Sequence, residues 1–87
     1  MTGRFSVNFD AQAELRKWPS LNNQRRPDRE TYIVTGGPLD QCIREFMAKP
    51  DPTRHLYEIH TARQPPLIMG VLATEHIVEL ARLKDFL

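Results

Sequence analysis

The clearest pattern of apolar and polar positions lies over residues 30–47, where the period changes from that of a strand to that of a helix. Residues 31–35 are mostly β-branched or aromatic, as strands prefer. The glycine pair 36–37 interrupts this run, and after Pro38 the apolar side chains recur at helical spacing, at Leu39, Cys42, Ile43, Phe46 and Met47. The pattern predicts a strand, a glycine turn and an amphipathic helix. The helix should end before Pro50, because proline disfavours helical geometry in the residue that precedes it.

The N-terminal segment predicts a strand followed by a helix. Apolar and polar residues alternate over residues 4–9, which is the period of a strand with one buried face. Asp10 is suited to accept a hydrogen bond from the first amides of a helix. The apolar residues of one helical face then follow at Ala11, Leu15 and Trp18. We expect this short helix to end at Pro19.

Residues 19–29 show no periodicity and consist almost entirely of turn formers and charged residues. We expect a surface loop of about ten residues here. Loops of that length without structure of their own are uncommon in compact domains and tend to be functional or mobile. This loop is therefore the first place to look for a binding surface.

The middle of the chain predicts a turn and a hairpin of two strands. Residues 50–53 contain two prolines and indicate a rigid turn. Residues 56–61 alternate between an apolar face and a polar face, whereas residues 67–72 are apolar on both faces. A strand of the second kind favours a central place in the sheet, with a neighbour on each side. The five-residue linker suits an antiparallel hairpin, and Gly70 indicates a bulge or a close backbone approach.

The last predicted element is a helix over residues 74–87. Thr74 is suited to be its N-cap, and apolar residues follow at helical spacing, at Ile77, Leu80, Ala81 and Leu83. The complete order is β-α-β-α-β-β-α, with a C-terminal β-hairpin followed by a helix. It predicts an α+β fold built as a two-layer sandwich of one sheet and its helices. At 87 residues the chain makes a single small domain, residues 1–87.

Composition and charge place the chain among small globular proteins. Hydrophobic residues make up 40% of the sequence and charged residues 26%, which is not the composition of a disordered chain. The N-terminus lacks the apolar core of a signal peptide, and the longest apolar run is far shorter than a membrane span, so we expect a cytoplasmic protein. A single cysteine, Cys42, excludes an internal disulfide and agrees with a reducing compartment.

The glycines at positions 36 and 37 would precede a helix, and exposed amides at a helix N-terminus can bind an anion. The segment lacks the pattern of a phosphate loop or of a dinucleotide fingerprint. Pro38 removes one amide, and Asp40 brings a negative charge to the first turn. We therefore prefer the interpretation that this turn simply requires glycine.

His55, Glu58 and His60 are residue types that a metal site or an acid/base pair would use. In a strand, the two histidines point to opposite faces and only Glu58 and His60 share one, so no third ligand can be assigned. Cys42 would be the nucleophile of an enzyme, but its place on the apolar stripe of a helix predicts a buried thiol. We expect no metal, cofactor or catalytic residue, and a small enzyme or ligand-binding subunit that uses residues 55–60 stays a further alternative.

The remaining charge feature is a local excess of basic residues. Within residues 16–29, a single acid, Asp28, opposes five of them: Arg16, Lys17, Arg25, Arg26 and Arg29. These side chains could contact the phosphates of a nucleic acid, and Trp18 could stack on a base, although its place on the predicted apolar face favours the core. The formal net charge of the chain is only +1, whereas nucleic-acid modules of this size carry a strongly basic face.

By elimination, the sequence favours a non-catalytic binding module, with a protein partner or a second copy of the chain as its ligand. Small domains often gain stability by oligomerisation. The final helix carries apolar residues on more than one face, and we expect an interface there at Val78, Leu83, Phe86 and Leu87. Nucleic-acid binding through the five basic residues is the alternative, and no contact with a membrane is expected.

Overall fold

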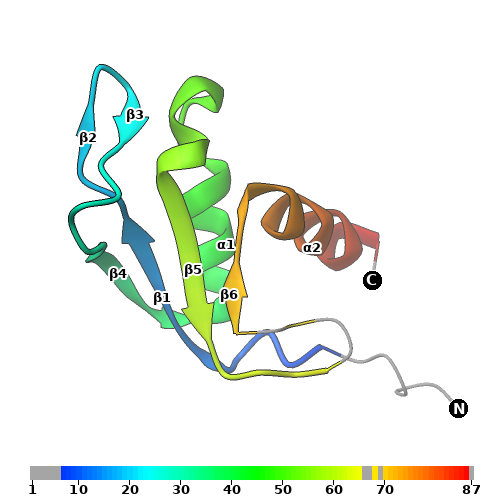
Figure 1. Cartoon of the computed structure of the whole chain (residues 1–87). Coiled ribbons are helices and arrows are strands. Elements are labelled where there is room, and N and C mark those ends of the chain that lie inside the picture. Colours follow the sequence, from blue (N-terminus) through cyan, green and yellow to red (C-terminus); the bar gives the residue numbers. More distant parts are fainter. Residues whose placement is uncertain (1–6, 66–67, 69, 87) are drawn as a thin grey trace, which may run out of the picture.

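The computed structural model describes residues 7–65, 68 and 70–86 and has a mixed α+β fold. A four-stranded antiparallel sheet with the order β4-β1-β5-β6 is packed against helices (Figure 1). Its strands are β1 (Gln12–Lys17), β4 (Tyr32–Pro38), β5 (Tyr57–Thr61) and β6 (Val71–Leu72). The other elements are the hairpin strands β2 (Ser20–Leu21) and β3 (Gln24–Arg25), the helices α1 (Leu39–Met47) and α2 (Thr74–Phe86), and the 3-10 helix η1 (Asp51–Leu56). The predicted fold class is confirmed.

The core lies between one face of the sheet and the helices α1 and α2. Each of these elements contributes apolar side chains that are almost completely buried, among them Leu15, Leu39, Phe46, Ile59, Leu72 and Ile77. The apolar stripe predicted for α1 is confirmed, since it supplies four buried residues of this core. Because the strands alternate, every second residue of β1 and β5 points away from the helices, to a face that we call the open face.

The segment expected to form the first helix is instead the central strand β1. Ala13 and Leu15 are buried under the helices, and the residues between and after them point to the open face, which is the period of a strand. Helical spacing also fits this sequence, but pairing with both β4 and β5 satisfies its backbone on two sides. Of the strand expected over residues 4–9, residues 7–9 are not in a strand, and residues 4–6 lie outside the described residues.

Part of the expected loop is a β-hairpin, formed by β2 and β3. The two residues of its turn, Asn22 and Asn23, have φ values of 54° and 62°. Positive φ at both central residues is the geometry of the tight turn that matches the twist of paired strands, and asparagine tolerates it better than most residues. The hairpin extends beyond the end of the sheet, beside η1 (Figure 1).

Two segments that were expected to be turns are instead part of regular secondary structure. β4 continues through Gly36 and Gly37, and α1 begins directly after Pro38, so no separate glycine turn exists. Gly37 takes a φ of 157°, which glycine adopts readily. The segment expected as a proline turn begins η1, in which the Thr53 amide donates to the Pro50 carbonyl.

The last strand, β6, lies at an edge of the sheet and not at its centre. Leu72 is buried, whereas Val71 is 54% exposed, so only the inward face of this apolar run is covered. Residues 67 and 69 of the expected strand lie outside the described residues, and Ile68 forms an isolated bridge with Gln64. Thr74 is the first residue of α2, and its hydroxyl donates to the Arg54 carbonyl, so the expected N-cap is wrong.

Replacing Leu15 by alanine should lower the free energy of unfolding by about 2 to 5 kcal/mol, because the side chain is completely buried and leaves a cavity. Leu21→Ala is the matched control. Leu21 is 61% exposed, so its removal should change stability by no more than about 0.5 kcal/mol. Denaturant unfolding measures both. Equal effects of the two substitutions would contradict a core centred on β1.

Candidate functional site

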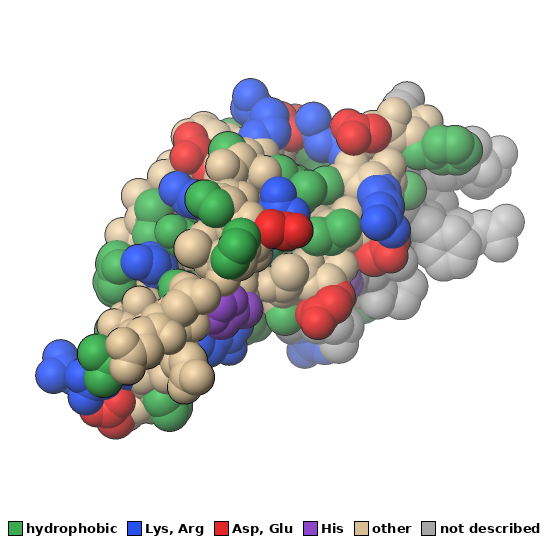
Figure 2. Space-filling model, turned by 90° about the horizontal axis from the view of Figure 1, so that it is seen from above, with side chains coloured by type: hydrophobic (Ala, Val, Ile, Leu, Met, Phe, Trp, Pro, Cys, Tyr) green, Lys and Arg blue, Asp and Glu red, His purple; other side chains and the backbone are tan. Residues whose placement is uncertain are grey.

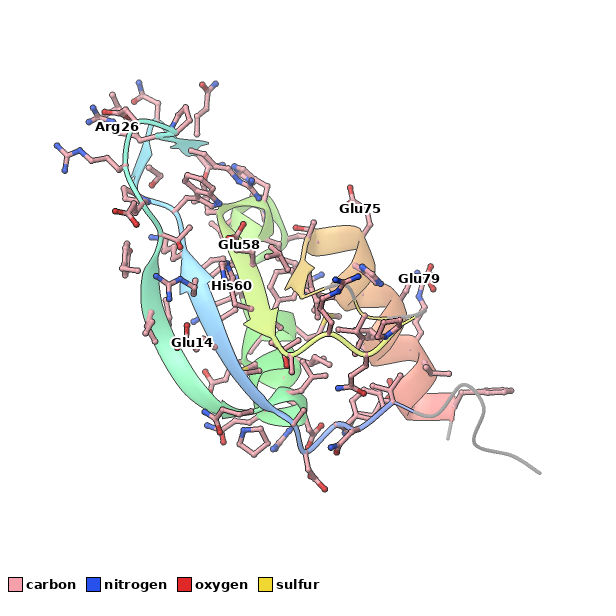
Figure 3. The ribbon with its side chains drawn as sticks, turned by 60° about the horizontal axis from the view of Figure 1, so that its bottom comes forward. Glu14, Arg26, Glu58, His60, Glu75 and Glu79 are labelled. Atoms are coloured by element: carbon pink, nitrogen blue, oxygen red, sulfur yellow. The ribbon has the colours of Figure 1, made fainter. Side chains whose placement is uncertain are left out.

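The open face carries a compact group of charged side chains from β1 and β5 (Figure 3). Glu14 is the cross-strand neighbour of His60, and Arg16 is that of Glu58. Within each strand the charged side chains are also in direct contact: Arg16 Nη1 lies 2.7 Å from Glu14 Oε1, and His60 Nε2 lies 2.5 Å from Glu58 Oε2. Acidic and basic side chains thus alternate, so this group does not present a patch of one sign.

Glu58 also holds Trp18, the residue that follows β1. The indole Nε1 donates to Glu58 Oε1 at 3.1 Å, while the other carboxylate oxygen faces His60. Trp18 is half-buried and lies outside the core, and the Arg25 guanidinium lies 5.4 Å from the centre of its ring. Both oxygens of Glu58 therefore have protein partners, and the preferred placement of Trp18 in the core is wrong.

The residues considered for an enzyme lie on opposite sides of the sheet. Cys42, a residue of α1, is fully buried on the helix side of the sheet, whereas Glu58 and His60 lie on the open face. Burial raises the pKa of the Cys42 thiol above its usual value, which favours the neutral and less nucleophilic form. His55 belongs to η1 and not to a strand. Within the described part of the chain, no three His, Cys, Asp or Glu side chains are placed to hold a metal ion.

Three hydrogen bonds fasten the hairpin to η1. Arg25 Nε donates to the His55 carbonyl at 2.6 Å. His55 Nε2 donates to the Asn23 carbonyl at 2.7 Å, since a carbonyl oxygen can only accept. The Asn23 side-chain amide donates to the Pro52 carbonyl at 3.0 Å. Arg25 and His55 therefore help to hold the hairpin against η1.

A pocket of about 330 Å³ opens beside these contacts, between the hairpin, η1 and the start of α2. Its lining includes basic side chains, Arg25 and Arg54, and acidic ones, Asp51 and Glu75. The Arg54 guanidinium donates to Asp51 and to the carbonyls at the end of α1, so it is engaged in holding that helix end. The pocket therefore does not select a ligand of one charge.

Two of the five basic residues proposed for nucleic-acid binding lie on opposite faces of β1. Arg16 is on the open face, where it also donates to the hydroxyl and the carbonyl of Thr31. Lys17 follows it on the strand and points to the other face, with its ammonium 5.9 Å from the centre of the Tyr57 ring. The two side chains are therefore turned away from one another.

The other basic residues lie in the hairpin and the segment after it. Arg26 and Arg29 share one acid, Asp28, at 3.1 Å and 3.9 Å. Figure 2 shows basic and acidic side chains next to one another at the corner that projects from the body of the molecule. With Arg25 bound to η1, the five residues do not form a common surface.

The first amides of α1, considered as an anion site, already have partners. The Leu39 amide donates to the Ala11 carbonyl and the Asp40 amide to the Phe9 carbonyl, both at 2.8 Å. These bonds hold the segment before β1 across the helix start. Lys84 Nζ, from α2, lies 2.7 Å from Asp40 Oδ1 and joins the two helices.

The outer side of β4 is an exposed apolar surface that the sequence pattern did not identify. β4 pairs with β1 along one side, and no strand of the described chain pairs along the other (Figure 1). Three consecutive apolar residues at its start are exposed: Tyr32, Ile33 and Val34. The strand contains no charged residue. We call this unpaired side, with these three side chains, the β4 edge. In the sequence, the signal for this surface was the apolar run Tyr32-Ile33-Val34, which places apolar side chains on both faces of the strand. Such a pattern favours a strand with a neighbour on each side.

The end of α2 was the expected interface. Val78 and Leu83 are partly buried against the core, whereas Phe86 is 88% exposed. Leu87 lies outside the described residues. The helix therefore uses much of its second apolar face within the fold, and Phe86 stays available at its end.

Comparison of the chain with protein-family models, with curated proteins and with solved structures finds no match in any of the three. The helices of the described chain are too short or too polar to cross a membrane.

Glu58→Ala should destabilise the fold by about 1 to 3 kcal/mol, because it leaves the half-buried indole N–H and the imidazole without their acceptor. It should also shift the fluorescence of Trp18, the single tryptophan. Glu79→Ala is the control, since this exposed carboxylate on α2 pairs with Arg82 on the same helix and should matter by less than about 0.5 kcal/mol. An unchanged emission spectrum in Glu58→Ala would contradict the contact.

Cys42 should make stability fall in alkaline solution. Its pKa is raised in the folded state, so the fold favours the neutral thiol, and this contribution is present below the unfolded pKa of about 8.5 and lost as the pH rises through the folded pKa. Cys42→Ala removes the titrating group. The stability advantage of the wild type over this variant, measured by denaturant unfolding, should therefore shrink as the pH rises above about 8.5. A constant difference would contradict the inference.

Proposed function

We propose that this chain is a non-catalytic protein-interaction module that binds a strand of its partner along the β4 edge. The observation that carries the proposal is a seven-residue outer strand with no charged residue and three exposed apolar side chains in a row. A free strand edge offers a row of unpaired amides and carbonyls to an incoming strand. The apolar side chains on its two faces add contact area to those hydrogen bonds.

The usual protection against such pairing is weak at this edge. Proteins block free edges with lysine, with inward-pointing charges, with proline, with β-bulges, or by keeping the strand short. Of these devices, β4 carries one bulge, at Val34. β4 is the longest strand of the sheet, and its single proline, Pro38, is the last residue. The opposite edge shows the contrast, because β6 has only two residues. The β4 edge is therefore the better place for a partner strand.

Nucleic-acid binding through Arg16, Lys17, Arg25, Arg26 and Arg29 is the second candidate. It is favoured by the exposure of the Arg26 and Arg29 side chains at the projecting corner. It has less support, because Asp28 opposes both and the other three are directed elsewhere. Such binding would weaken steeply as salt is raised.

The proposal predicts a partner whose capture depends on Ile33. The tagged chain is incubated with nuclease-treated lysate of the organism that carries the sequence. An untagged copy of the chain is added, so that a second copy can be captured as well. Bound proteins are identified by mass spectrometry. Ile33→Lys should reduce the captured protein by about tenfold or more, because it places a charge in the edge contact.

Val71→Lys is the matched control, since Val71 and Ile33 are β-branched residues with the same exposed fraction, 54%, on the two opposite edge strands. It should leave capture unchanged. Capture that Ile33→Lys and Val71→Lys affect equally would contradict the β4 edge. Material that binds in a parallel sample of untreated lysate and is absent after nuclease would favour the nucleic-acid candidate.

A further inference from the structure

β4 contains a bulge that changes which of its residues share a face. Leu15 of β1 pairs with Thr35, but the next residue of β1, Arg16, pairs with Ile33, so Val34 is an extra residue in β4. Since Arg16 points to the open face, Ile33 lies on the open face as well. Without the bulge, residues 33 and 36 would point to opposite faces, because they are an odd number apart.

With the bulge, residues near the start of β4 share their faces with the glycines near its end. Gly36 pairs with Glu14 and therefore lies on the open face, as Ile33 does. Gly37 pairs with the buried Ala13 and lies on the helix face. Tyr32 pairs with Lys17 and lies on that face too. Each face of the strand thus carries one large side chain near the start and one glycine near the end.

We propose that the occupant of the β4 edge is a second copy of this chain, whose β4 pairs antiparallel with the first around a two-fold axis. This inference rests on the proposed function. Ile33 of one copy lies opposite Gly36 of the other on the open face, and Tyr32 lies opposite Gly37 on the helix face. The axis passes between Val34 and Thr35, and the two sheets become one continuous sheet.

Size complementarity favours this occupant. A large side chain opposite a glycine on the neighbouring strand covers the backbone that the glycine leaves open, and such pairs stabilise sheets. The two-fold makes each copy supply both halves of the match. An unrelated strand would have to carry large residues at the same two positions to cover Gly36 and Gly37.

The charges that flank β4 do not oppose the pairing under the two-fold. Arg16 lies beside Ile33, and Glu14 lies beside Gly36. Each open-face row that crosses the two copies therefore runs from Arg16 of one copy to Glu14 of the other. β4 itself adds no like charges at the contact, because it has no ionisable residue except Tyr32.

The first test is the oligomeric state of the purified chain. Sedimentation velocity across a series from low to high micromolar concentration should show a species of twice the 10.1 kDa chain mass. Ile33→Lys should raise the dissociation constant by about tenfold or more, and Val71→Lys should leave it unchanged. Circular dichroism checks that both variants are folded, as their exposed positions predict.

A disulfide test addresses the register. In a Cys42→Ala background, chains with Ile33→Cys and chains with Gly36→Cys are oxidised separately and as a mixture. The space around Gly36 accepts a side chain, since among the described residues no atom beyond its two chain neighbours lies within 4 Å of the position of an added Cβ. Opposite residues of paired strands are close enough for a disulfide, so the mixture should give far more cross-linked dimer than either chain alone.

A dimer that resists Ile33→Lys, or cross-links formed equally in all three samples, would overturn the inference. A chain that stays monomeric at every concentration would overturn it as well. In that case, capture of another protein that is lost with Ile33→Lys would leave the proposed function standing, whereas no Ile33-dependent capture at all would remove both.

Discussion

The structure depends above all on the pairing of β1 with strands on both of its sides. β1 joins β4, which follows it by about fifteen residues, to β5, which follows by about forty, and it buries Ala13 and Leu15 beneath α1. Its alternate residues organise the charges of the open face. The chain that leaves its end carries Trp18 and then the hairpin. Because β1 occupies the centre, β4 has a neighbour on one side only.

Several charged side chains of the described chain are engaged with other parts of the fold. Glu58 holds Trp18 and His60, Arg54 holds the end of α1, and Arg25 holds the hairpin on η1. In a domain of 87 residues, where the core is small, such contacts position segments that burial alone would leave loose. The longest strand of the described sheet with an unpaired side is β4, with its apolar edge, which is why we propose an interaction with another strand as the function.

Sequence patterns predicted the elements from residue 32 onward better than those before it. α1 and β5 have one dominant period, and the structure follows it. The segment before Pro19 fits both a helical and a strand period, and local spacing could not choose between them. The Asn22–Asn23 pair was a usable turn signal, since asparagine tolerates positive φ, but the strands on either side have only two residues each. The basic residues were identified by type, while their directions depended on the strand that carries two of them.

The sequence by itself determined the α+β class, the apolar stripe of α1, the buried position of Cys42 and the alternation of β5, because each follows from the spacing of nearby residues. Only the tertiary structure decided that residues 12–17 form the central strand, that β6 lies at an edge, and that β4 has an unpaired side. These outcomes depend on strand order, which is set by contacts between residues far apart in the chain. Local periodicity carries no information about which strand becomes the neighbour of which.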